Sequence, residues 1–346
     1  MAKTTFFFSV IIPVFNRLSE IQELLPSLEQ QSIPLNRFEV LLIDDGSSDG
    51  TEAWIKEKMK STEISLRYFK QAHRGPGSAR NLGMQNASGE YFVFVDSDCT
   101  VPSNWLKLIE SALIRNLGIR GFGGRDDARS DFPSLLLAIN YSMTSFLTTG
   151  GMRGGKKRRL AKFYPRSFNM GIHRELVGII GGFGSLRHGQ DIEFSHRMIQ
   201  SGEKVIYIPE SVVYHKRRTS LFRFFRQVFN WGVARINLYK MDSGMLEWLH
   251  AMPALGFWLA VFVSVAALAF PSLRPIWSAL AEFVLVLLIS GGLHSGIRWR
   301  NFWAGLLTPV VMILQISGYA LGFTAAWIWR VLLGRDEWTG FVRKYY

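Results

Sequence analysis

The sequence predicts an α/β domain followed by a hydrophobic helical region. Short apolar runs alternate with helical patterns up to about residue 215, and three long, nearly uncharged stretches follow residue 247. Short continuous apolar runs between helices are typical of a parallel sheet covered on both faces. We therefore expect an α/β domain over 1–215, a basic amphipathic helix region over 216–246, and membrane helices over 247–346.

Composition narrows the class of protein. The chain has 346 residues, with 40 Lys and Arg against 27 Asp and Glu, a net charge of +13. This charge favours anionic partners, and 48% apolar residues exclude a fully disordered chain. The single Cys99 excludes an intrachain disulfide framework and a zinc site built on cysteines.

The expected elements follow from the apolar pattern. The first apolar run, residues 6–15, is broken by Pro13 and lacks a small-residue cleavage site, which favours a buried strand over a signal peptide. Strands are expected over 8–14, 38–44, 65–69 and 91–98, and helices over 18–31, 51–59 and 77–87.

Polar side chains gather where these strands end. In open α/β sheets, ligands bind beyond the carboxyl ends of the strands. An acidic turn with a following glycine suits a nucleobase or ribose, although an ordinary Asp-Gly-Ser turn has the same composition. The residues at these strand ends are Asn16, Asp44, Asp45, Asp96 and Asp98.

Two motifs near the strand expected over 91–98 point to phosphate chemistry. Asp96 and Asp98 are separated by one residue, and two carboxylates on one turn can share a divalent cation. Arg80 and Asn81 lie on a helix opened by a glycine-rich turn, where a guanidinium and backbone N–H groups can meet phosphate. A capped helix with a surface arginine is the alternative for the second motif.

A later segment supplies a candidate base and a further metal ligand. Asp191 and Glu193 fall at the start of a predicted helix, where the helix dipole favours an ionised carboxylate. Such a carboxylate beside a substrate hydroxyl is a candidate general base. His215 closes the next strand and can ligate a metal. Taken singly, a histidine at a strand end and an aspartate at a helix N-terminus are more often structural than functional.

In order and spacing, these residues closely resemble the family 2 glycosyltransferases with the GT-A fold. The resemblance covers about residues 8–215. Its matching runs are VIIPVFN, LLIDDGSSDGT, GPGSARNLGMQNASGEYFVFVDSD, FNMGIHRELVGIIGGF, GQDIEFSHRMIQSG and VIYIPESVVYH.

The resemblance implies an inverting transfer of a sugar from a nucleotide-diphosphate donor to a hydroxyl. It assigns Pro13 to Asn16 and the acidic turn Asp44–Asp45 to the nucleoside, with Asp45 on the base. It assigns Arg80 to the diphosphate and Asp96 with Asp98 to Mg²⁺ or Mn²⁺. The general base falls on Asp191.

The chain departs from the family pattern at two places. Gln190 occupies the position of the acid in the family's Glu-Asp pair, so the base rests on Asp191 or, as the alternative, Glu193. Gln227, Asn230 and Trp231 give only a degraded match to a Gln-x-x-Arg-Trp signature, which speaks against processive synthesis. A nucleotidyltransferase and a non-catalytic membrane scaffold are the two alternatives, although the first lacks a glycine-rich signature at the first strand.

The C-terminal third is suited to a bilayer. Residues 253–270 and 302–329 carry no charge and residues 276–293 carry only Glu282, lengths that match a hydrocarbon core. Tryptophans stand near their ends, as in interfacial belts. Buried soluble helices are the alternative.

Two basic stretches, 153–166 and 216–240, each hold seven Lys or Arg and no acid. The second predicts an interfacial helix on anionic lipid, although a solvated basic face is the alternative. Its apolar positions are Phe222, Phe225, Phe229, Val233 and Ile236, opposite Arg223, Arg226 and Asn230.

A nucleotide-sugar enzyme at a bilayer predicts a lipid or lipid-linked glycan acceptor and a role in cell-envelope polysaccharide synthesis. Because the basic stretches adjoin apolar helices, we expect anionic lipid and no nucleic acid as partner. The positive-inside rule places the catalytic domain on the cytoplasmic face. Three full spans would put the basic C-terminal residues on the opposite face, which favours a hairpin or interfacial third stretch.

Overall fold

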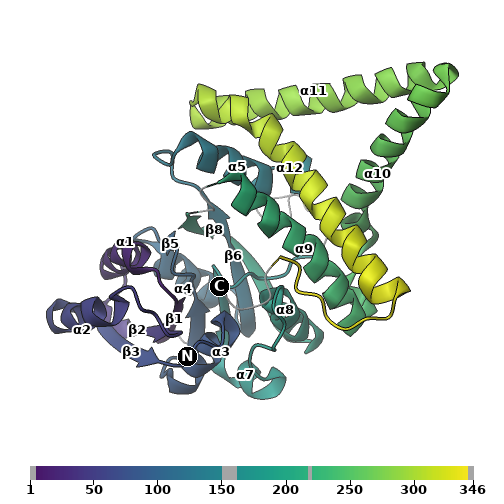
Figure 1. Ribbon diagram of the computed structural model, residues 1–346. Coiled ribbons are helices and arrows are strands. Elements are labelled where there is room, and N and C mark those ends of the chain that lie inside the picture. Colours follow the sequence, from purple (N-terminus) through teal and green to yellow (C-terminus); the bar gives the residue numbers. More distant parts are fainter. Residues whose placement is uncertain (1–4, 150–161, 217–219, 342–346) are drawn as a thin grey trace. The chain divides into compact units, whose positions relative to one another are not determined.

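The computed structural model describes residues 5–149, 162–216 and 220–341, and most of the basic stretch 153–166 lies outside them. The chain forms two compact units (Figure 1). Within the described residues, the first unit comprises 5–127 and 163–216, and the second comprises 128–149, 162 and 220–341. Composition alone did not indicate that residues 128–149 join the C-terminal helices.

The first unit is built on an eight-stranded sheet of order β3-β2-β1-β4-β7-β6-β8-β5. Its strands are β1 (Phe8–Val14), β2 (Phe38–Asp44), β3 (Ser65–Lys70), β4 (Tyr91–Phe94), β5 (Cys99–Thr100), β6 (Ile119–Asp127), β7 (Met170–His173) and β8 (Lys204–His215). Its helices are α1 (Leu18–Glu29), α2 (Thr51–Ser61), α3 (Pro76–Asn86), α4 (Trp105–Arg115), α7 (Arg174–Ile180) and α8 (Gln190–Gln200), with a 3-10 turn, η1 (Leu35–Arg37).

The expectation of a purely parallel sheet is wrong. β3, β2, β1 and β4 are parallel, but β7 runs antiparallel to both β4 and β6, and β5 runs antiparallel to β8. The strand expected over 91–98, β4, also ends at Phe94 rather than at residue 98. Residues 96–98 therefore form a turn between β4 and β5, and this turn carries the two aspartates.

Alternation along β1 explains why both faces of the sheet are covered. Val10 and Ile12 point into one apolar core, which α1 and α4 complete, whereas Ile11 points into a second core with α3 and α8. Successive side chains on a strand face opposite sides. α3 lies very close to the sheet, since a Cβ on Gly83 would stand 2.4 Å from Ile11 Cγ2. This close packing fixes the helix that carries Arg80.

The second unit is helical. Its helices are α5 (Ser134–Thr144), α6 (Phe146–Thr149), α9 (Leu221–Met241), α10 (Trp248–Ala269), α11 (Arg274–Trp299) and α12 (Phe302–Trp327). Short 3-10 turns, η2 (Ser243–Met245) and η3 (Pro271–Leu273), precede α10 and α11, and a π-helical turn, η4 (Ile328–Leu332), extends α12. Among the residues that the structure describes, three segments are long and apolar enough to cross a membrane: Trp248–Ala269, Pro271–Trp299 and Phe302–Leu332.

α10, α11 and α12 form the three sides of a triangle in Figure 1. Hydrogen bonds close two of its corners, from Trp277 on α11 to Ser264 on α10 and from Trp258 on α10 to Thr324 on α12. The third corner is a backbone contact, since a Cβ on Gly292 would stand 2.9 Å from the carbonyl oxygen of Gly305.

α9, which the sequence predicted as an interfacial helix, packs along α12 within the second unit. Cβ atoms on Gly232 and Gly322 would lie 2.3 Å and 2.0 Å from backbone oxygens of the facing helix, so the two backbones nearly touch. The assignment of Asn230 to an exposed polar face is wrong. Asn230 is buried, and its side-chain oxygen accepts a hydrogen bond from the backbone of Phe341.

Candidate active site

A short strand pair assembles the metal-binding candidates. β5 contains only Cys99 and Thr100, and it pairs with the end of β8 so that Cys99 lies opposite His215. The backbone N–H of Lys216 donates to the carbonyl of Asp98 at 2.8 Å, which extends this pairing into the turn. Residues more than 100 positions apart in the sequence therefore meet at one point.

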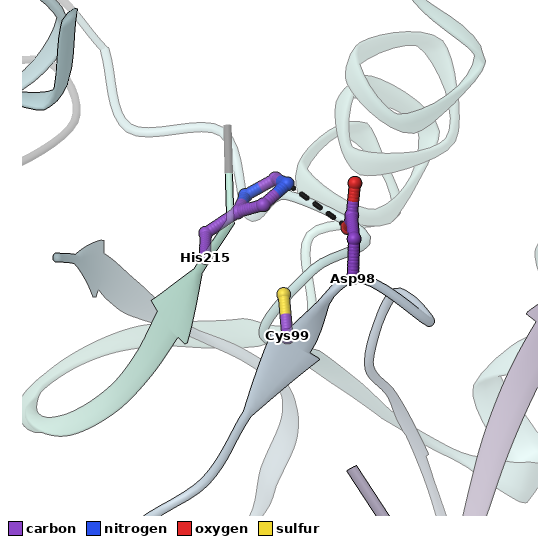
Figure 2. A group of neighbouring side chains, drawn as sticks. All are labelled: Asp98, Cys99 and His215. Atoms are coloured by element: carbon purple, nitrogen blue, oxygen red, sulfur yellow. Dashed lines mark ion pairs between the residues drawn. The ribbon is translucent and has the colours of Figure 1, made fainter. Parts of the chain in front are cut away.

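Figure 2 shows the resulting group of Asp98, Cys99 and His215. Nε2 of His215 lies 3.0 Å from a carboxylate oxygen of Asp98, and one ligand atom from each of the three residues lies within 4.8 Å of the others. Burial raises the pKa of the Cys99 thiol, and the neighbouring carboxylates of Asp98 and Asp96 add to the rise.

Asp96 has a different partner from Asp98. Nη2 of the buried Arg80 lies 2.6 Å from an oxygen of Asp96, and the guanidinium also stacks over the ring of Phe183 at 5.4 Å. Burial raises the pKa of Asp96, Arg80 opposes this, and Asp98 adds to the rise. The structure thus brings Arg80, Asp96, Asp98 and His215 together as one connected group.

A second carboxylate lies on the other side of His215. Oδ2 of Asp126, near the end of β6, is 3.8 Å from Nδ1 of the ring, and the Asp126 side chain is completely buried. Sequence analysis missed Asp126 because the run Arg-Asp-Asp-Ala-Arg has the composition of a surface turn. In the structure, buried Gly124 and Asp126 alternate with half-exposed Arg125 and Asp127.

The acidic turn after β2 is closed by its own loop. Asp44 accepts hydrogen bonds from the backbone N–H of Ser47 and from the hydroxyl of Tyr68. Burial and Asp44 raise the pKa of Tyr68, so this hydroxyl remains a donor. Asp45 accepts from the backbone N–H groups of Arg74 and Gly75 at 2.8 Å each, and both aspartates are buried. Their carboxylates therefore organise the loop that follows β3.

The turn that follows β1 is more accessible than the acidic turn that follows β2. Asn16 is exposed, adopts a positive φ of 49°, and accepts a hydrogen bond from the backbone of Ser48 at 2.8 Å. Beside it, the ring of Phe15 stacks on His73 with centroids 4.1 Å apart. Pro13 lies buried within β1. The two loops thus join at Asn16, and a partly exposed aromatic pair adjoins them.

The two candidate bases on α8 have different surroundings. Asp191 is partly exposed, and its Oδ2 accepts a hydrogen bond from Nη1 of Arg166 at 3.3 Å. Glu193 is buried and paired with Arg197, which also donates to the carbonyl of Gly182. Glu193 therefore serves to anchor the loop before α8, and Asp191 is the more accessible carboxylate.

Gln190 joins the start of α8 to the start of α3. A Cβ on Gly77 would stand 2.6 Å from Oε1 of Gln190, so the amide lies directly against the helix that carries Arg80. Sequence analysis also missed the partners Arg166 and Phe183, whose roles depend on contacts between distant segments.

Residues 9–171 match the family profile described as glycosyl transferase family 2. This stretch of the chain therefore matches a glycosyl transferase family 2 domain. Among its relatives, glycosyltransferase AglE of Haloferax volcanii is 27% identical over 262 residues, 75% of this chain and 82% of AglE.

A second relative comes from Methanococcus voltae and is described as a dolichyl N-acetyl-α-D-glucosaminyl phosphate 3-β-D-2,3-diacetamido-2,3-dideoxy-β-D-glucuronosyltransferase. It is 24% identical over 322 residues, 85% of this chain and 98% of that protein. The structure of a mannosyltransferase from Pyrobaculum calidifontis, in complex with GDP-mannose and Mn²⁺, superposes with a TM-score of 0.62 at 19% identity, covering 91% of this chain and 87% of that chain.

These comparisons confirm the predicted class of fold and enzyme. The first unit has the GT-A fold, and the protein is a glycosyltransferase. This enzyme class decides against the two alternatives, a nucleotidyltransferase and a non-catalytic scaffold. The three apolar segments fit membrane association.

Proposed function

We propose that this glycosyltransferase moves a sugar from a nucleoside-diphosphate donor to a hydroxyl of a lipid-linked acceptor, with inversion at the anomeric carbon. The Asp98–His215 pair carries the proposal, because it sets an oxygen and a nitrogen ligand 3.0 Å apart beside Asp96 and Arg80. Such a group suits the diphosphate of a donor.

Asp98 and His215 would hold the divalent cation, with Asp96 beside them. A mixed carboxylate and imidazole set suits Mn²⁺ better than Mg²⁺, which prefers oxygen ligands throughout. The solved Pyrobaculum calidifontis mannosyltransferase contains Mn²⁺ and GDP-mannose, which supports the same assignment here. When bound, the cation would neutralise charge on the departing diphosphate.

Arg80 would support the proposed metal site through its ion pair with Asp96. Its guanidinium holds one oxygen of Asp96 at 2.6 Å and is itself buried, so it keeps this carboxylate in place next to Asp98. We infer that Arg80 reaches the diphosphate only if that ion pair opens. The accessible Asn16 turn, with the Phe15–His73 pair, would receive the nucleoside.

Asp191 would act as the base. The acceptor hydroxyl oxygen forms a bond to the anomeric carbon, the bond from this carbon to the diphosphate oxygen breaks, and the hydroxyl proton passes to Asp191. Arg166 orients the Asp191 carboxylate through its 3.3 Å contact. One such displacement inverts the anomeric centre, with no covalent sugar–enzyme intermediate.

The proposal of a lipid acceptor and of an orientation toward the cytoplasm is argued from the second unit. Its three apolar segments support association with a membrane, and the Methanococcus voltae relative is named for a dolichyl N-acetyl-α-D-glucosaminyl phosphate acceptor. The seven basic residues of 216–240, with no acid among them, support a cytoplasmic site facing anionic lipid.

A donor screen tests the proposal. The full chain in detergent is titrated calorimetrically with GDP-mannose, UDP-N-acetylglucosamine and related donors in Mn²⁺, and transfer to a lipid extract is followed by NMR of the new glycosidic bond. We expect one donor to bind only with Mn²⁺ and to give a product of inverted configuration. A retained configuration, or donor binding equal in Mn²⁺ and EDTA, would overturn it.

A further inference from the structure

α9 and α12 run parallel and in contact. A Cβ on Gly318 of α12 would stand 2.6 Å from Cγ2 of Val228 on α9. Further along both helices, Oδ1 of Asn237 accepts a hydrogen bond at 3.0 Å from Nη1 of Arg330, in the π-helical turn that extends α12. Because both helices advance in the same direction between these contacts, α12 can cross a bilayer only if α9 crosses beside it.

The composition of α9 is unsuited to a crossing. Four basic side chains and no acidic one are spread over both of its halves: Arg223, Arg226, Arg235 and Lys240. A charged side chain in the centre of a bilayer is costly. By contrast, α10 and α11 hold only Glu282 as a charged residue between their ends. α9 therefore has the composition of a helix that lies on a membrane surface.

The tail that follows α12, residues 333–341, returns along α9. The carbonyl of Trp338 accepts a hydrogen bond from the amide of Asn237 at 2.8 Å, and the backbone N–H of Phe341 donates to Asn230 at 3.1 Å. This tail contains no α-helix or strand and carries three charged residues, at 335–337. Irregular backbone exposed to hydrocarbon leaves polar groups unpaired. The side of α9 that binds the tail is thus suited to water or headgroups.

α12 also differs from α10 and α11 in exposure. In the most apolar stretch of α10 and of α11, 11% of the residues are buried, against 44% in α12. Leu306, Val310 and Ile313, at 46–57% exposure, follow one side of α12, whereas Val311 and Ala320 are completely buried. α12 therefore presents a single apolar face, while α10 and α11 are exposed around most of their circumference.

The junction of α10 and α11 is built for a polar boundary. As Figure 1 shows, the two helices leave opposite ends of α12 and meet at their other ends. Their junction is the 3-10 turn Pro271–Leu273, followed by the exposed Arg274, and Trp277 lies one turn further on. Arginine and tryptophan are favoured at membrane interfaces. With 22 and 26 residues, the helices are about 33 and 39 Å long, enough for a core of about 30 Å.

We propose that α10 and α11 cross the bilayer as a two-helix hairpin, whereas α12 lies with α9 along one surface and turns its apolar face toward the acyl chains of anionic lipid. The tail then stays on the face from which α10 enters. The first unit shares this face, because the five residues between β8 and α9 reach about 20 Å, less than the thickness of the hydrocarbon core. This inference goes beyond the proposed function and does not depend on the reaction.

Cysteine labelling of the full chain tests the number of crossings. Ser272→Cys marks the junction of α10 and α11, Asp336→Cys marks the tail, and Glu57→Cys marks the first unit, all at exposed positions. The wild type, whose Cys99 is buried, is the blank. A membrane-impermeant maleimide is added to spheroplasts of expressing bacteria before and after permeabilisation. We expect Ser272→Cys to react from one face, and Asp336→Cys and Glu57→Cys from the other.

Two labelling patterns would contradict the hairpin. If Asp336→Cys reacts from the same face as Ser272→Cys and opposite to Glu57→Cys, α12 crosses the membrane and the proposal is wrong. If all three react from one face, or if alkaline carbonate extracts the chain from the membrane, α10 and α11 do not cross.

The depth of α12 is a second, independent readout. Leu285 and Ile313 lie near the middle of α11 and of α12 and are similarly exposed, at 56% and 52%. Each is replaced by a spin-labelled cysteine, in vesicles of phosphatidylcholine and phosphatidylglycerol, and depth is measured from collisions with oxygen and a nickel chelate. We expect the Leu285→Cys label near the midplane and the Ile313→Cys label only about 5–10 Å below the surface. Equal depths would overturn the surface position of α12.

Discussion

The two units of this chain differ in how far their large apolar side chains are exposed. In the first unit the apolar side chains of the sheet are buried, as with Val10, Ile11 and Phe94 at 0% exposure. In the second unit large apolar side chains lie outside, such as Leu268 at 84% and Ile297 at 75%, while Ser295 and Thr308 are fully buried. The first pattern is that of a protein in water, and the second is that of helices in hydrocarbon.

The difference extends to how polar groups are used. In the first unit they gather at strand ends and form an ion-pair chain, as with Arg80–Asp96 and His215–Asp98. In the second unit they join helix to helix, as with Ser142 to Gln315 and Tyr141 to His294. These uses are consistent with chemistry in the first unit and with membrane association of the second.

The largest expected effect concerns the base. Asp191→Asn should lower the transfer rate by about 10² to 10⁴ while leaving donor affinity unchanged, because a base acts on the acceptor proton in the transition state. Initial rates and donor calorimetry on the same protein measure the two quantities. Glu175→Gln, an exposed acid of the first unit, is the control. Near-normal turnover in Asp191→Asn would remove the base from this position.

Packing in the second unit gives the next effect. Gly322→Leu should lower stability in detergent by about 1–3 kcal/mol, because even a Cβ there would stand 2.0 Å from a backbone oxygen of Phe229. Gly256→Leu on α10 is the matched control, since a Cβ at Gly256 meets nothing within 4 Å. Thermal unfolding measures the change. Equal losses in both variants would show that the α9–α12 contact is not the determining one.

A pH effect should be confined to the first unit. Hydrogen bonds from Ser9, Arg67 and the backbone of Ser88 outweigh burial and lower the pKa of Glu39 from its ordinary 4.5. A depressed pKa stabilises the fold above pH 4.5, and this stabilisation is lost as the pH falls through the lower value in the folded state. Each unit of depression corresponds to roughly 1.4 kcal/mol.

The pH prediction is tested with Glu39→Gln, which should flatten the dependence of unfolding temperature on pH between about 3 and 5. Glu57→Gln, an exposed glutamate on α2, should leave it as in the wild type. A Glu39→Gln protein with the wild-type pH profile would show that other carboxylates govern acid unfolding of the first unit.

The smallest expected loss of stability comes from removing a single interhelical hydrogen bond. Thr308 Oγ1 and Ser295 Oγ lie 2.8 Å apart between α12 and α11. Thr308→Val should cost only about 0.6 kcal/mol, the average for such bonds between membrane helices. Ser317→Ala, whose hydroxyl bonds carbonyls of its own helix, is the control. A loss above about 2 kcal/mol in Thr308→Val would mean that this contact behaves as a buried bond in a water-soluble core.

Local patterns in the sequence were enough to predict most elements of the fold. The strand over 8–14 and the helix that begins at residue 18 follow from short-range apolar spacing, and the structure has both. The two-residue strand β5 has no such pattern, and its pairing with His215 depends on a segment more than 100 residues away. The antiparallel β7 was missed for the same reason.

The site was predictable as a set of residue types but not as a set of contacts. The sequence placed Asp96 and Asp98 on one turn, and only the folded chain shows that Asp96 faces Arg80 while Asp98 faces His215. Likewise, a seemingly open acidic turn at Asp44 and Asp45 is closed by donors from the 68–75 loop. Asn230 is buried and accepts a hydrogen bond from the backbone of Phe341, a contact that the helical pattern of α9 does not reveal.

Transfer of label into lipid tests the central claim most directly. The full chain in vesicles that contain a bacterial or archaeal lipid extract receives a radiolabelled nucleotide sugar and Mn²⁺, and the product is partitioned between organic solvent and water. The account predicts label in the organic phase that requires Mn²⁺ and disappears in Asp98→Asn and His215→Gln. Label that stays in water as free sugar, or lipid labelling that persists in EDTA, would contradict it.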